Sequence, residues 1–481
     1  MINLMIAGEA RSAAANKTFE RRHPVSGDVA TIAAAASPED AIAAVDAAQA
    51  AFPAWAATSP SAQRALLLKA AEALSNRASD FLAAMSAELG AGQIWVGANI
   101  ELAKKVLIEA AALTTQIVGE TLPTDQAGVW SLSLREPAGV VLGIAPWNAP
   151  LVLGARAIAV PLACGNTVVF KGSEVCPATH WILADVFREA GFPPGVVNFV
   201  THAAEDAAPV VEALIAHPAV RRVNFTGSTR VGRRIGALAG QHLKPVVLEL
   251  GGKAPLVVLE DADIEAAAAA ASFGAFANQG QICMSTERVV AVGSAAEPLV
   301  AALVARAETL NALDLSVHGA ALGIMVDAAS CARAEDLIED ARAKGGRVLC
   351  GGVIADGRIA PTVIDGVTRD MRLYDEESFA PLLAIIRVAD ADAAVAVAND
   401  APYGLSAAVF GENLGQTLSA ARRIQSGICH INGTTVGDEP QSPFGGVKDS
   451  GFGRFGGRAG IEAFTELRWV TIATQRQTYP F

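Results

Sequence analysis

The sequence predicts an α/β protein built from two domains. The chain has 481 residues, and a single hydrophobic core stops growing at about 250 to 300 residues, so a second core is expected. From residue 139 onward, short runs rich in β-branched residues alternate with helical stretches. Apolar strands that alternate with helices are typical of parallel βαβ units whose sheets are covered on both faces. We expect the junction of the two domains near residue 250.

The first third of the chain is expected to be mainly helical after a short β-rich start. Ser37 and Asp40 match a capping box, and Pro38 takes the first helical position, so a helix should run to about residue 56. Another helix should end at Gly90, which suits a left-handed C-cap. The further helices are predicted over residues 60–77, 80–89 and 96–118.

The strands of the two sheets are expected in short apolar runs. Those before the junction lie at residues 139–144, 167–170, 196–200 and 221–225. Those after it lie at residues 254–260 and 287–293, with further candidates near Arg347 and Leu382.

One apolar segment, residues 139–170, is long enough to cross a membrane and has Arg156 as its only charge. Prolines and asparagines interrupt it, and backbone groups freed by such breaks have no partner in lipid. We therefore predict a buried strand, a loop, a buried helix and a second buried strand. The N-terminus has no basic leader, so we expect no signal peptide and a cytoplasmic location.

Charge and cysteine usage narrow the classes of partner. The net charge is −12, from 49 acidic and 37 basic residues, and this field repels polyanions and anionic lipid. Neither nucleic acid nor a membrane is an expected partner. The six cysteines are widely spaced without a CxxC pair, which indicates reduced thiols and not a disulfide framework or a metal site.

Two glycine-rich segments are candidate phosphate loops. GFGRFG at residues 451–456 fits GxGxxG formally, but no strand of a βαβ unit precedes it, so we interpret it as a turn-rich loop. In FTGSTRVG, residues 225–232, a β-branched strand runs into Gly227 and Ser228 and then a helix. Free backbone N–H groups and the positive helix end favour phosphate there. An ordinary strand-to-helix turn is the alternative.

Two candidate reactive side chains follow. Glu249 is a lone carboxylate in the apolar run VVLELGG; burial would raise its pKa and make it a base near neutrality, unless it serves in a structural salt bridge. Cys283 follows a glycine-containing turn after a long alanine-rich helix. A thiolate is a strong nucleophile for a carbonyl, although most buried cysteines are inert.

Seven segments, in this order, resemble motifs of the aldehyde dehydrogenase superfamily, and the resemblance covers almost the whole chain. They are APWN (145–148), KGSE (171–174), FTGSTRVG (225–232), LELGGK (248–253), FANQGQIC (276–283), EESFAP (376–381) and SPFGGVKDSGFGR (442–454).

The resemblance implies a Rossmann-like NAD-binding domain, an α/β catalytic domain and a small β oligomerisation segment. The NAD-binding domain is expected to comprise residues 1–118 and 139–250, with a return at 446–468, and the catalytic domain residues 251–445. The β-like segments 119–138 and 469–481 would pair between subunits, so a homodimer or a tetramer is expected.

The resemblance also assigns catalytic roles. Cys283 is expected to attack the aldehyde and form a thiohemiacetal, whose oxyanion is held by the Asn148 side-chain amide and the Cys283 backbone N–H. Hydride transfer to the nicotinamide leaves a thioester. Glu249 is expected to activate the water that hydrolyses this thioester to the carboxylic acid. No metal is implied.

The adenosine ribose of the cofactor is expected at Lys171 and Glu174. The Glu174 carboxylate can accept a hydrogen bond from a ribose 2′-hydroxyl and would repel a 2′-phosphate, so NAD is expected and not NADP. Lys171 weakens this inference, because its ammonium could partly neutralise a phosphate.

The other cofactor contacts carry over in the same way. Glu377 resembles the ligand of the nicotinamide ribose, and Phe379 is expected to pack beside the nicotinamide. The chain departs from the usual motifs at Ala380, where the family has glycine, and at Gly172, where it often has proline. The remaining expected cofactor contacts are Gly227 and Ser228 at the pyrophosphate, with Ala145, Trp147, Ser173, Gly232 and Leu250.

Residues 109–125, 148–180 and 430–457 resemble the bacterial enzymes that act on salicylaldehyde, vanillin and benzaldehyde, so an aromatic aldehyde is the expected substrate. Arg156, alone in an apolar helix beyond Asn148, could face the substrate tunnel and attract a ring's phenolate or carboxylate. An interface or capping arginine is the alternative. Trp95 and Trp147 could form aromatic walls or belong to the core.

Several other functions stay open. An aliphatic aldehyde or a semialdehyde could be the substrate of the same mechanism. A CoA-acylating enzyme would not need Glu249 as a base, and a cofactor-free thiol hydrolase would leave Glu174 and the Gly227 turn without purpose. A binding protein that has lost activity is disfavoured by the intact set of Asn148, Glu249 and Cys283.

Overall fold

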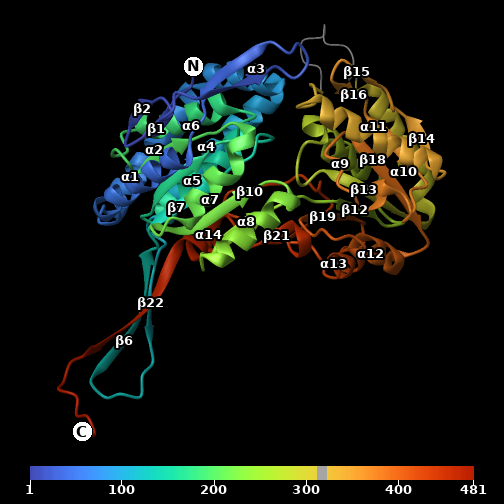
Figure 1. Ribbon diagram of the computed structural model, residues 1–481. Coiled ribbons are helices and arrows are strands. Elements are labelled where there is room, and N and C mark those ends of the chain that lie inside the picture. The colour runs from blue at the N-terminus through green and yellow to red at the C-terminus, as the bar shows by residue number, and fades with distance from the viewer. Residues whose placement is uncertain (311–321) are drawn as a thin grey trace.

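The computed structural model describes residues 1–310 and 322–481. Two α/β lobes lie side by side, and a long β arm extends from the first of them (Figure 1). The chain passes from the sheet of the first lobe to the sheet of the second between Glu249 and Ala254.

The first lobe contains an eight-stranded sheet in the order β2-β1-β9-β8-β7-β10-β11-β21. Its five central strands, β9, β8, β7, β10 and β11, are parallel. The direction in which successive strands are added to the sheet reverses between β7 and β10. In open α/β sheets, ligands bind outside the carboxyl ends of the strands at such a reversal. The strands are β1 (Leu4–Ile6), β2 (Glu9–Arg11), β7 (Val140–Ile144), β8 (Thr167–Lys171), β9 (Val197–Val200), β10 (Val220–Thr226), β11 (Val246–Glu249) and β21 (Gly451–Phe452).

Helices cover both faces of this sheet because successive strand residues point to opposite sides. Val141 packs with α2 to α6 and α14, whereas Leu142 packs with α1, α7 and α8. The helices of this lobe are α1 (Pro38–Ala56), α2 (Pro60–Asn76), α3 (Ala78–Leu89), α4 (Gln93–Leu113), α5 (Pro150–Ala163), α6 (Pro177–Glu189), α7 (Ala207–Ala216), α8 (Thr229–Gln241) and α14 (Gly457–Phe464).

The expected helix signals of the first third are confirmed with one correction. Ser37 and Asp40 form the capping box of α1, and α3 ends at Gly90, which has a φ of +64°. Helix α4 begins and ends earlier than the predicted 96–118. Its last turn stops at Thr114, whose hydroxyl donates to the carbonyl of Ala111 at 2.9 Å, because a β-branched residue that bonds the local backbone favours a helix end.

The apolar segment 139–170 forms strand β7, a loop, helix α5 and strand β8, as predicted. Every residue of α5 is buried, Arg156 included. Within the described ranges, we find no helix with the length and apolar character needed to span a bilayer.

The second lobe contains a seven-stranded sheet in the order β14-β17-β18-β13-β12-β19-β20. All neighbouring pairs are parallel except β14 with β17. The strand expected near Arg347 is therefore an antiparallel edge strand and not part of a parallel unit. The strands are β12 (Ala254–Val258), β13 (Thr286–Val292), β14 (Arg347–Cys350), β17 (Thr362–Asp365), β18 (Leu382–Val388), β19 (Ser406–Phe410) and β20 (Ile428–Ile431).

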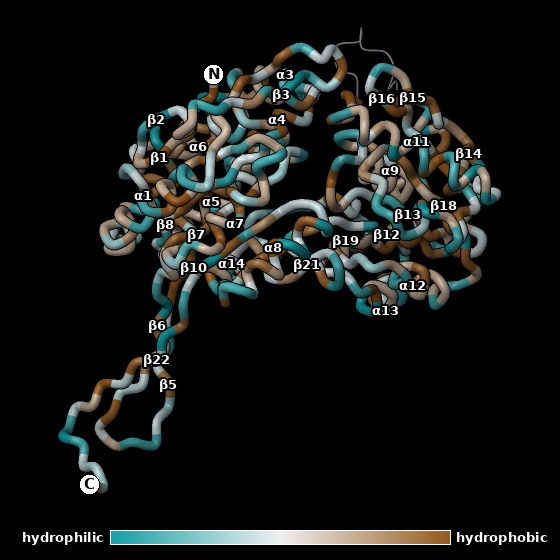
Figure 2. The backbone as a smooth tube through the Cα atoms, in the orientation of Figure 1, coloured by the Kyte–Doolittle hydropathy of each residue, from teal (hydrophilic) through white to brown (hydrophobic). Residues whose placement is uncertain are grey.

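Helices also cover both faces of the second sheet, and Figure 2 shows hydrophobic stretches running through both lobes. Helices α9 and α10 pack on one face, and α11, α12 and α13 pack on the other. They are α9 (Ile264–Phe276), α10 (Ala296–Thr309), α11 (Ala328–Ala343), α12 (Ala391–Asn399) and α13 (Leu414–Ala421).

The arm is a three-stranded antiparallel sheet of β5 (Glu120–Leu122), β6 (Val129–Pro137) and β22 (Thr465–Ala473). Strand β22 begins before the predicted residue 469, and residues 474–481 form no strand, because the register with β6 ends at Ala473. Two small hairpins complete the fold: β3 (Thr18–Arg22) with β4 (Val29–Ala34), and β15 (Ile354–Ala355) with β16 (Arg358–Ile359).

Candidate active site

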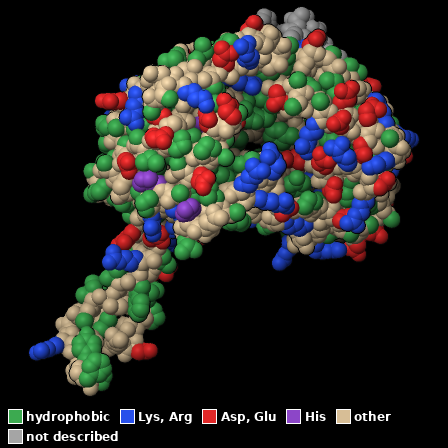
Figure 3. Space-filling model, in the orientation of Figure 1, with side chains coloured by type: hydrophobic (Ala, Val, Ile, Leu, Met, Phe, Trp, Pro, Cys, Tyr) green, Lys and Arg blue, Asp and Glu red, His purple; other side chains and the backbone are tan. Residues whose placement is uncertain are grey.

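The expected site residues lie where the two sheets face each other. The segments after β7, β8, β10 and β11 share the carboxyl edge of the first sheet, and the segments before β12, β13 and β18 share one edge of the second. Figure 3 shows a hollow between the two lobes at this level. Residues that are far apart in the sequence therefore meet across one cleft.

Cys283 lies in the tight turn between a 3₁₀ segment, Ala277–Gly280, and strand β13. Asn278 and Gln279 in that segment have φ values of +47° and +57°, which non-glycine residues rarely adopt and which often mark functional sites. A Cβ atom on Gly252 would lie 2.4 Å from the Cys283 carbonyl oxygen. Only glycine allows this approach, so the LELGGK motif packs directly against the cysteine.

Glu249 ends strand β11 and is 1% exposed. Burial raises the pKa of Glu249 to about 7, an effect that the adjacent Cys283 thiol and the Arg156 charge oppose. Among the described residues, neither carboxylate oxygen has a hydrogen-bond partner. The expectation of a buried base near neutrality is thus met in burial and in pKa.

Burial and the nearby Glu249 raise the pKa of the Cys283 thiol well above its ordinary value. The thiol is therefore protonated at neutral pH in this state. A cysteine of this kind attacks a carbonyl only when a base takes its proton, and Glu249 is the charged group that acts most strongly on the pKa of this thiol.

Asn148 lies in the APWN loop between β7 and α5 and is 7% exposed. Its Nδ2 atom donates to the Gln281 carbonyl at 3.0 Å, so the amide faces the turn that carries Cys283. The backbone carbonyl of Asn148 accepts hydrogen bonds from Trp95 Nε1 at 3.0 Å and from Asn278 Nδ2 at 3.2 Å. These contacts fix the loop and aim an N–H donor toward the reacting region.

The EESFAP loop before β18 brings Glu377 and Phe379 to the same cleft. Glu377 Oε1 accepts the Gly252 N–H at 2.9 Å, and burial, with the charge of Glu287, raises the pKa of Glu377 to about 8. Phe379 has a φ of +50°, and its ring meets Trp147 edge to face with centroids 5.8 Å apart. Both side chains reach the cleft, and their contacts with the nicotinamide half of the cofactor stay a prediction.

Glu287 and Lys253 hold segments of the candidate site together, and the sequence analysis did not predict them. Both are buried and form an ion pair, and Glu287 also accepts the backbone N–H groups of Ser378 and Phe379. The carboxylate thereby holds the EESFAP loop against the LELGGK segment. The available signal was a pair of charged residues, Glu287 and Arg288, at the head of the apolar run TERVVAV.

The expected adenosine contacts lie just beyond strand β8. Lys171 is 7% exposed, and its ammonium lies 3.5 Å from Glu174 Oε2. Although burial acts to raise it, the pKa of Glu174 is lowered by the Lys171 charge, so this carboxylate is ionised at neutral pH. The Ser173 N–H donates to His180 Nδ1 at 2.9 Å and fixes the turn.

The turn from strand β10 into helix α8 is the predicted phosphate site, residues 225–232. The Ser228 hydroxyl caps α8, and the Gly227 N–H donates to the Glu249 carbonyl at 3.0 Å. A Cβ on Gly232 would lie 2.3 Å from Leu250, so α8 packs closely on the chain that follows β11. The start of a helix suits a pyrophosphate, but the Gly227 N–H is already bonded to Glu249. The contacts of Gly227 and Ser228 with a dinucleotide stay a prediction.

GFGRFG forms no such turn. Its first two residues are strand β21, which pairs antiparallel with β11 at Glu249 and Leu248. The interpretation as a turn-rich loop is therefore corrected: Gly451 and Phe452 form an edge strand of the first sheet, and Phe455 forms a β-bridge with Phe444.

Arg156 does not stand free in the cleft. Its Nη2 atom lies 2.5 Å from Asp438 Oδ2, and the two side chains are 5% and 8% exposed. The guanidinium also lies over the ring of Phe444, at 4.2 Å from the centroid. Asp438 was not anticipated from the sequence. A direct contact of Arg156 or Trp95 with substrate stays a prediction.

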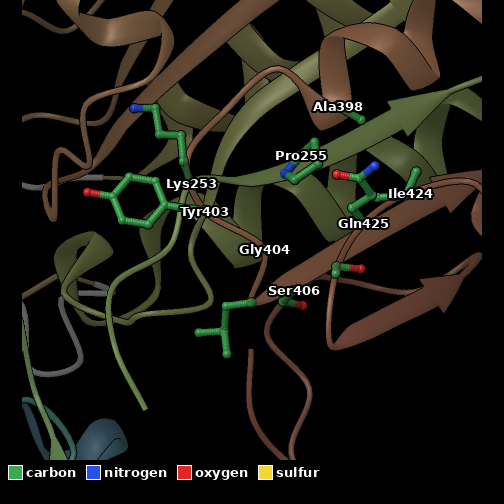
Figure 4. A pocket seen from close by; sticks show the side chains of 10 residues that line it. Lys253, Pro255, Ala398, Tyr403, Gly404, Ser406, Ile424 and Gln425 are labelled. Atoms are coloured by element: carbon green, nitrogen blue, oxygen red, sulfur yellow. The ribbon is translucent and has the colours of Figure 1, made fainter. Parts of the chain in front are cut away.

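A small pocket lies beside this site, behind the Lys253 segment (Figure 4). Lys253 and Tyr403 extend to one side of it, and Pro255, Ile424 and Gln425 lie on the other. It contains none of the expected catalytic side chains, so the chemistry belongs to the cleft between the lobes.

Comparisons with known proteins agree with this geometry. The model of the aldehyde dehydrogenase family matches residues 11–470. The chain belongs to the aldehyde dehydrogenase family. The fold predicted from the motif resemblance is thereby confirmed.

Three members of the family show how similar this chain is to proteins of named activity. A vanillin dehydrogenase of Pseudomonas fluorescens is 54% identical over 100% of this chain and 99% of its own length. The crystal structure of a salicylaldehyde dehydrogenase from Pseudomonas putida G7, complexed with salicylaldehyde, has a TM-score of 0.98 at 47% identity and covers 100% and 99% of the two chains. A betaine aldehyde dehydrogenase of Staphylococcus aureus, in complex with NAD+, has a TM-score of 0.94 at 27% identity and covers 100% and 97%.

Proposed function

We propose that the chain oxidises an aromatic aldehyde to the carboxylic acid with NAD and water. The observation that carries this proposal is the buried Glu249 carboxylate, with a pKa of about 7 and no hydrogen-bond partner among the described residues, beside Cys283. A base of this kind is needed to hydrolyse a thioester with water. It has no such use if CoA takes the acyl group.

The side chains perform the reaction in a fixed order. Glu249 takes the proton of the Cys283 thiol, and the thiolate attacks the aldehyde carbon. The Asn148 amide and the Cys283 N–H stabilise the oxyanion that forms. The nicotinamide, when bound, accepts the hydride. Glu249 releases the thiol proton to solvent and then removes a proton from water, whose oxygen bonds to the thioester carbon. The C–S bond breaks, the acid leaves and the Cys283 thiolate is restored.

NAD is the cofactor we propose, because Glu174 is ionised and lies at the expected ribose site. A carboxylate there accepts a 2′-hydroxyl and repels a 2′-phosphate. The NAD+ complex of the Staphylococcus aureus relative supports the same choice. Replacing Glu174→Gln should weaken NAD binding, strengthen NADP binding and shift the ratio of the two dissociation constants toward NADP, measured by isothermal titration calorimetry.

The aromatic substrate is supported by the relatives that act on vanillin and salicylaldehyde. Trp95 and Trp147, next to Asn148, provide flat surfaces for a ring. An aliphatic aldehyde or a semialdehyde remains the second candidate within the same chemistry.

One assay tests the proposal. The protein is mixed with NAD and a panel of vanillin, salicylaldehyde, benzaldehyde, hexanal and succinic semialdehyde without CoA, and NADH and acid are followed. We expect turnover, fastest with the aromatic members. Glu249→Gln should slow the burst of NADH, because the Cys283 thiol loses its base, and should abolish the hydrolysis of the thioester that still forms, so that steady turnover stops. NADH formed only when CoA is added would contradict the proposal.

The protein is also proposed to act in the cytoplasm as a homodimer or tetramer joined through the arm. All six cysteines are free, which suits a reducing compartment. The assembly is supported by the apolar side chains exposed on the arm (Figure 3).

A further inference from the structure

A buried ion pair lies next to the proposed base and has no part in the chemistry described so far. Arg156 belongs to α5, and Asp438 belongs to the segment after β20. Their side chains are 5% and 8% exposed and 2.5 Å apart at the closest atoms. Such a pair is costly to bury and rarely contributes net stability, so a role in function is a reasonable expectation.

The packing ties this pair to the strand of Glu249. The Arg156 guanidinium lies over the rings of Phe444 and Phe455, at 4.2 and 5.7 Å from their centroids. These two phenylalanines form a β-bridge with each other. Gly451, four residues before Phe455, pairs directly with Glu249 in the sheet. One short stretch of chain thus holds both the pair and the carboxylate.

Four charged or ionisable atoms here are buried without a hydrogen-bond partner among the described residues. They are Arg156 Nη1, Asp438 Oδ1 and both carboxylate oxygens of Glu249. Charges that are neither solvated nor saturated by hydrogen bonds act strongly on one another, because the local dielectric constant is low.

We propose that Arg156 and Asp438 are positioning residues that set, by their opposite charges, the proton affinity of Glu249 for the hydrolytic step. The inference rests on the proposed function, in which Glu249 is the base. Three groups act on this carboxylate: the Cys283 thiol, the Arg156 cation, which lowers the pKa of Glu249, and the Asp438 anion, which raises it. Burial is the largest cause of the raised pKa of Glu249, and the pair adds two smaller effects of opposite sign.

Removal of the Arg156 charge and removal of the Asp438 charge should shift the pKa of Glu249 in opposite directions, and this makes the proposal testable. In Arg156→Met the uncompensated Asp438 anion disfavours the charged carboxylate, so the pH at which hydrolysis reaches half its maximum should rise by about one unit. In Asp438→Asn the uncompensated Arg156 cation favours the carboxylate, so this pH should fall by a similar amount. The double variant should return toward the wild-type value.

The measurement is the pH dependence of steady turnover after the NADH burst, with benzaldehyde as substrate because its ring carries no ionisable group. The titration of Cys283 is followed separately, from the rate of alkylation by iodoacetamide at each pH. A purely structural role would lower activity in both single variants without moving the two profiles in opposite directions. That result, or two shifts in the same direction, would overturn the proposal.

A second readout does not depend on turnover. The ionisation of Glu249 is followed directly by infrared difference spectra of the carboxyl band, taken between each variant and the same variant carrying Glu249→Gln. Opposite shifts of this titration support the pair's role even if the wild-type protein turned out to be inactive. If wild type is active and the titration is unchanged in both variants, only this inference fails.

The same variants separate this role from substrate binding by Arg156. Salicylaldehyde and vanillin are compared with benzaldehyde at the optimum pH of each variant. A rise of KM confined to the hydroxylated aldehydes, with no shift of the pH profile, would overturn the proposal in favour of a substrate contact. Arg156→Lys retains the positive charge and should keep the profile within about 0.3 units of wild type, given that a full charge loss shifts it by about one.

Discussion

Glu287 and Lys253 form an ion pair in the interior of the second lobe, with side chains 3% and 0% exposed. Lys253 immediately precedes β12 and Glu287 lies at the start of β13, which are neighbouring parallel strands. Because the same carboxylate accepts the N–H groups of Ser378 and Phe379, it also fixes the loop before β18. Three segments, of which one follows Cys283 and two carry expected cofactor contacts, are thus joined through one side chain.

Replacing Glu287→Gln should destabilise the protein strongly. The Lys253 ammonium would lose its counter-charge in a site without access to water, and breaking a buried pair from one side costs about 3 to 5 kcal/mol of unfolding free energy. Urea unfolding followed by tryptophan fluorescence measures the loss. As a matched control, Glu462→Gln removes the partner of the exposed Arg458 and should change stability little. Equal effects at the two sites would contradict this role of Glu287.

Replacing Asn148→Ala should slow the chemical step with little change in stability. The amide is the side-chain donor aimed at the Cys283 turn, and loss of one oxyanion donor typically costs a factor of about 10² to 10³ in rate. The burst of NADH in stopped flow measures this step. Trp95→Phe removes the hydrogen bond to the Asn148 backbone carbonyl and part of the indole ring but leaves the amide donor in place, so it should have a much smaller effect on the burst at saturating aldehyde. A normal burst in Asn148→Ala would rule out this oxyanion role.

The fold was predictable from the sequence where a local signal coincided with a buried face. The capping box at Ser37, the C-cap at Gly90 and the interrupted apolar segment around α5 all gave the observed elements. The antiparallel pairing of β14 was not predictable, because a strand of four residues contains no information about the direction of its neighbour. The predicted helix 96–118 runs past the end of α4, because Thr114 bonds the local backbone there and an apolar pattern alone does not show this.

The motifs predicted that Cys283, Glu249 and Asn148 lie together, and the structure brings all three to one cleft; their catalytic roles stay predictions. Glu287 and Asp438 could not be predicted in this way, because the contacts that give them a role are with residues distant in the sequence. Arg156 illustrates the difference: the sequence showed an isolated charge in an apolar helix, whereas the structure supplies its partner, Asp438, from 282 residues away.

The raised pKa of Glu249 should appear in the pH dependence of stability. The folded protein holds a proton on this carboxylate up to about pH 7, whereas an unfolded glutamate releases it near 4.5. Between these values the native state binds one more proton, so the unfolding free energy contributed by Glu249 falls by about 1.4 kcal/mol per pH unit as pH rises.

The measurement for this effect compares wild type with Glu249→Gln in urea unfolding at pH 4.5, 5.5, 6.5 and 7.5. The stability of wild type relative to the variant should be greatest at the lowest pH and should decline by about 3 kcal/mol by neutrality. If the unfolding free energies of wild type and variant change with pH in parallel over this range, burial does not shift the pKa of Glu249.

The arm should control assembly, because both of its faces expose large apolar side chains. Leu467 and Trp469 alternate along β22 on one face and are 63% and 73% exposed, and Ile472 pairs with Trp130 on the other, at 51% and 59%. Exposed apolar area of this kind marks a surface for another chain, and a second copy supplies a matching strand edge.

Introducing charge at two of these positions, Leu467→Glu with Trp469→Glu, should therefore convert the assembled protein into monomers, measured as molar mass by light scattering after size-exclusion chromatography. Leu414→Glu, at a position 65% exposed on the first turn of α13, is the matched control and should leave the mass unchanged. Because the cleft that contains Cys283 lies between the lobes of one chain, the monomeric variant should still bind NAD. A double variant that keeps the wild-type mass, or a wild-type protein that is itself monomeric, would contradict assembly through the arm.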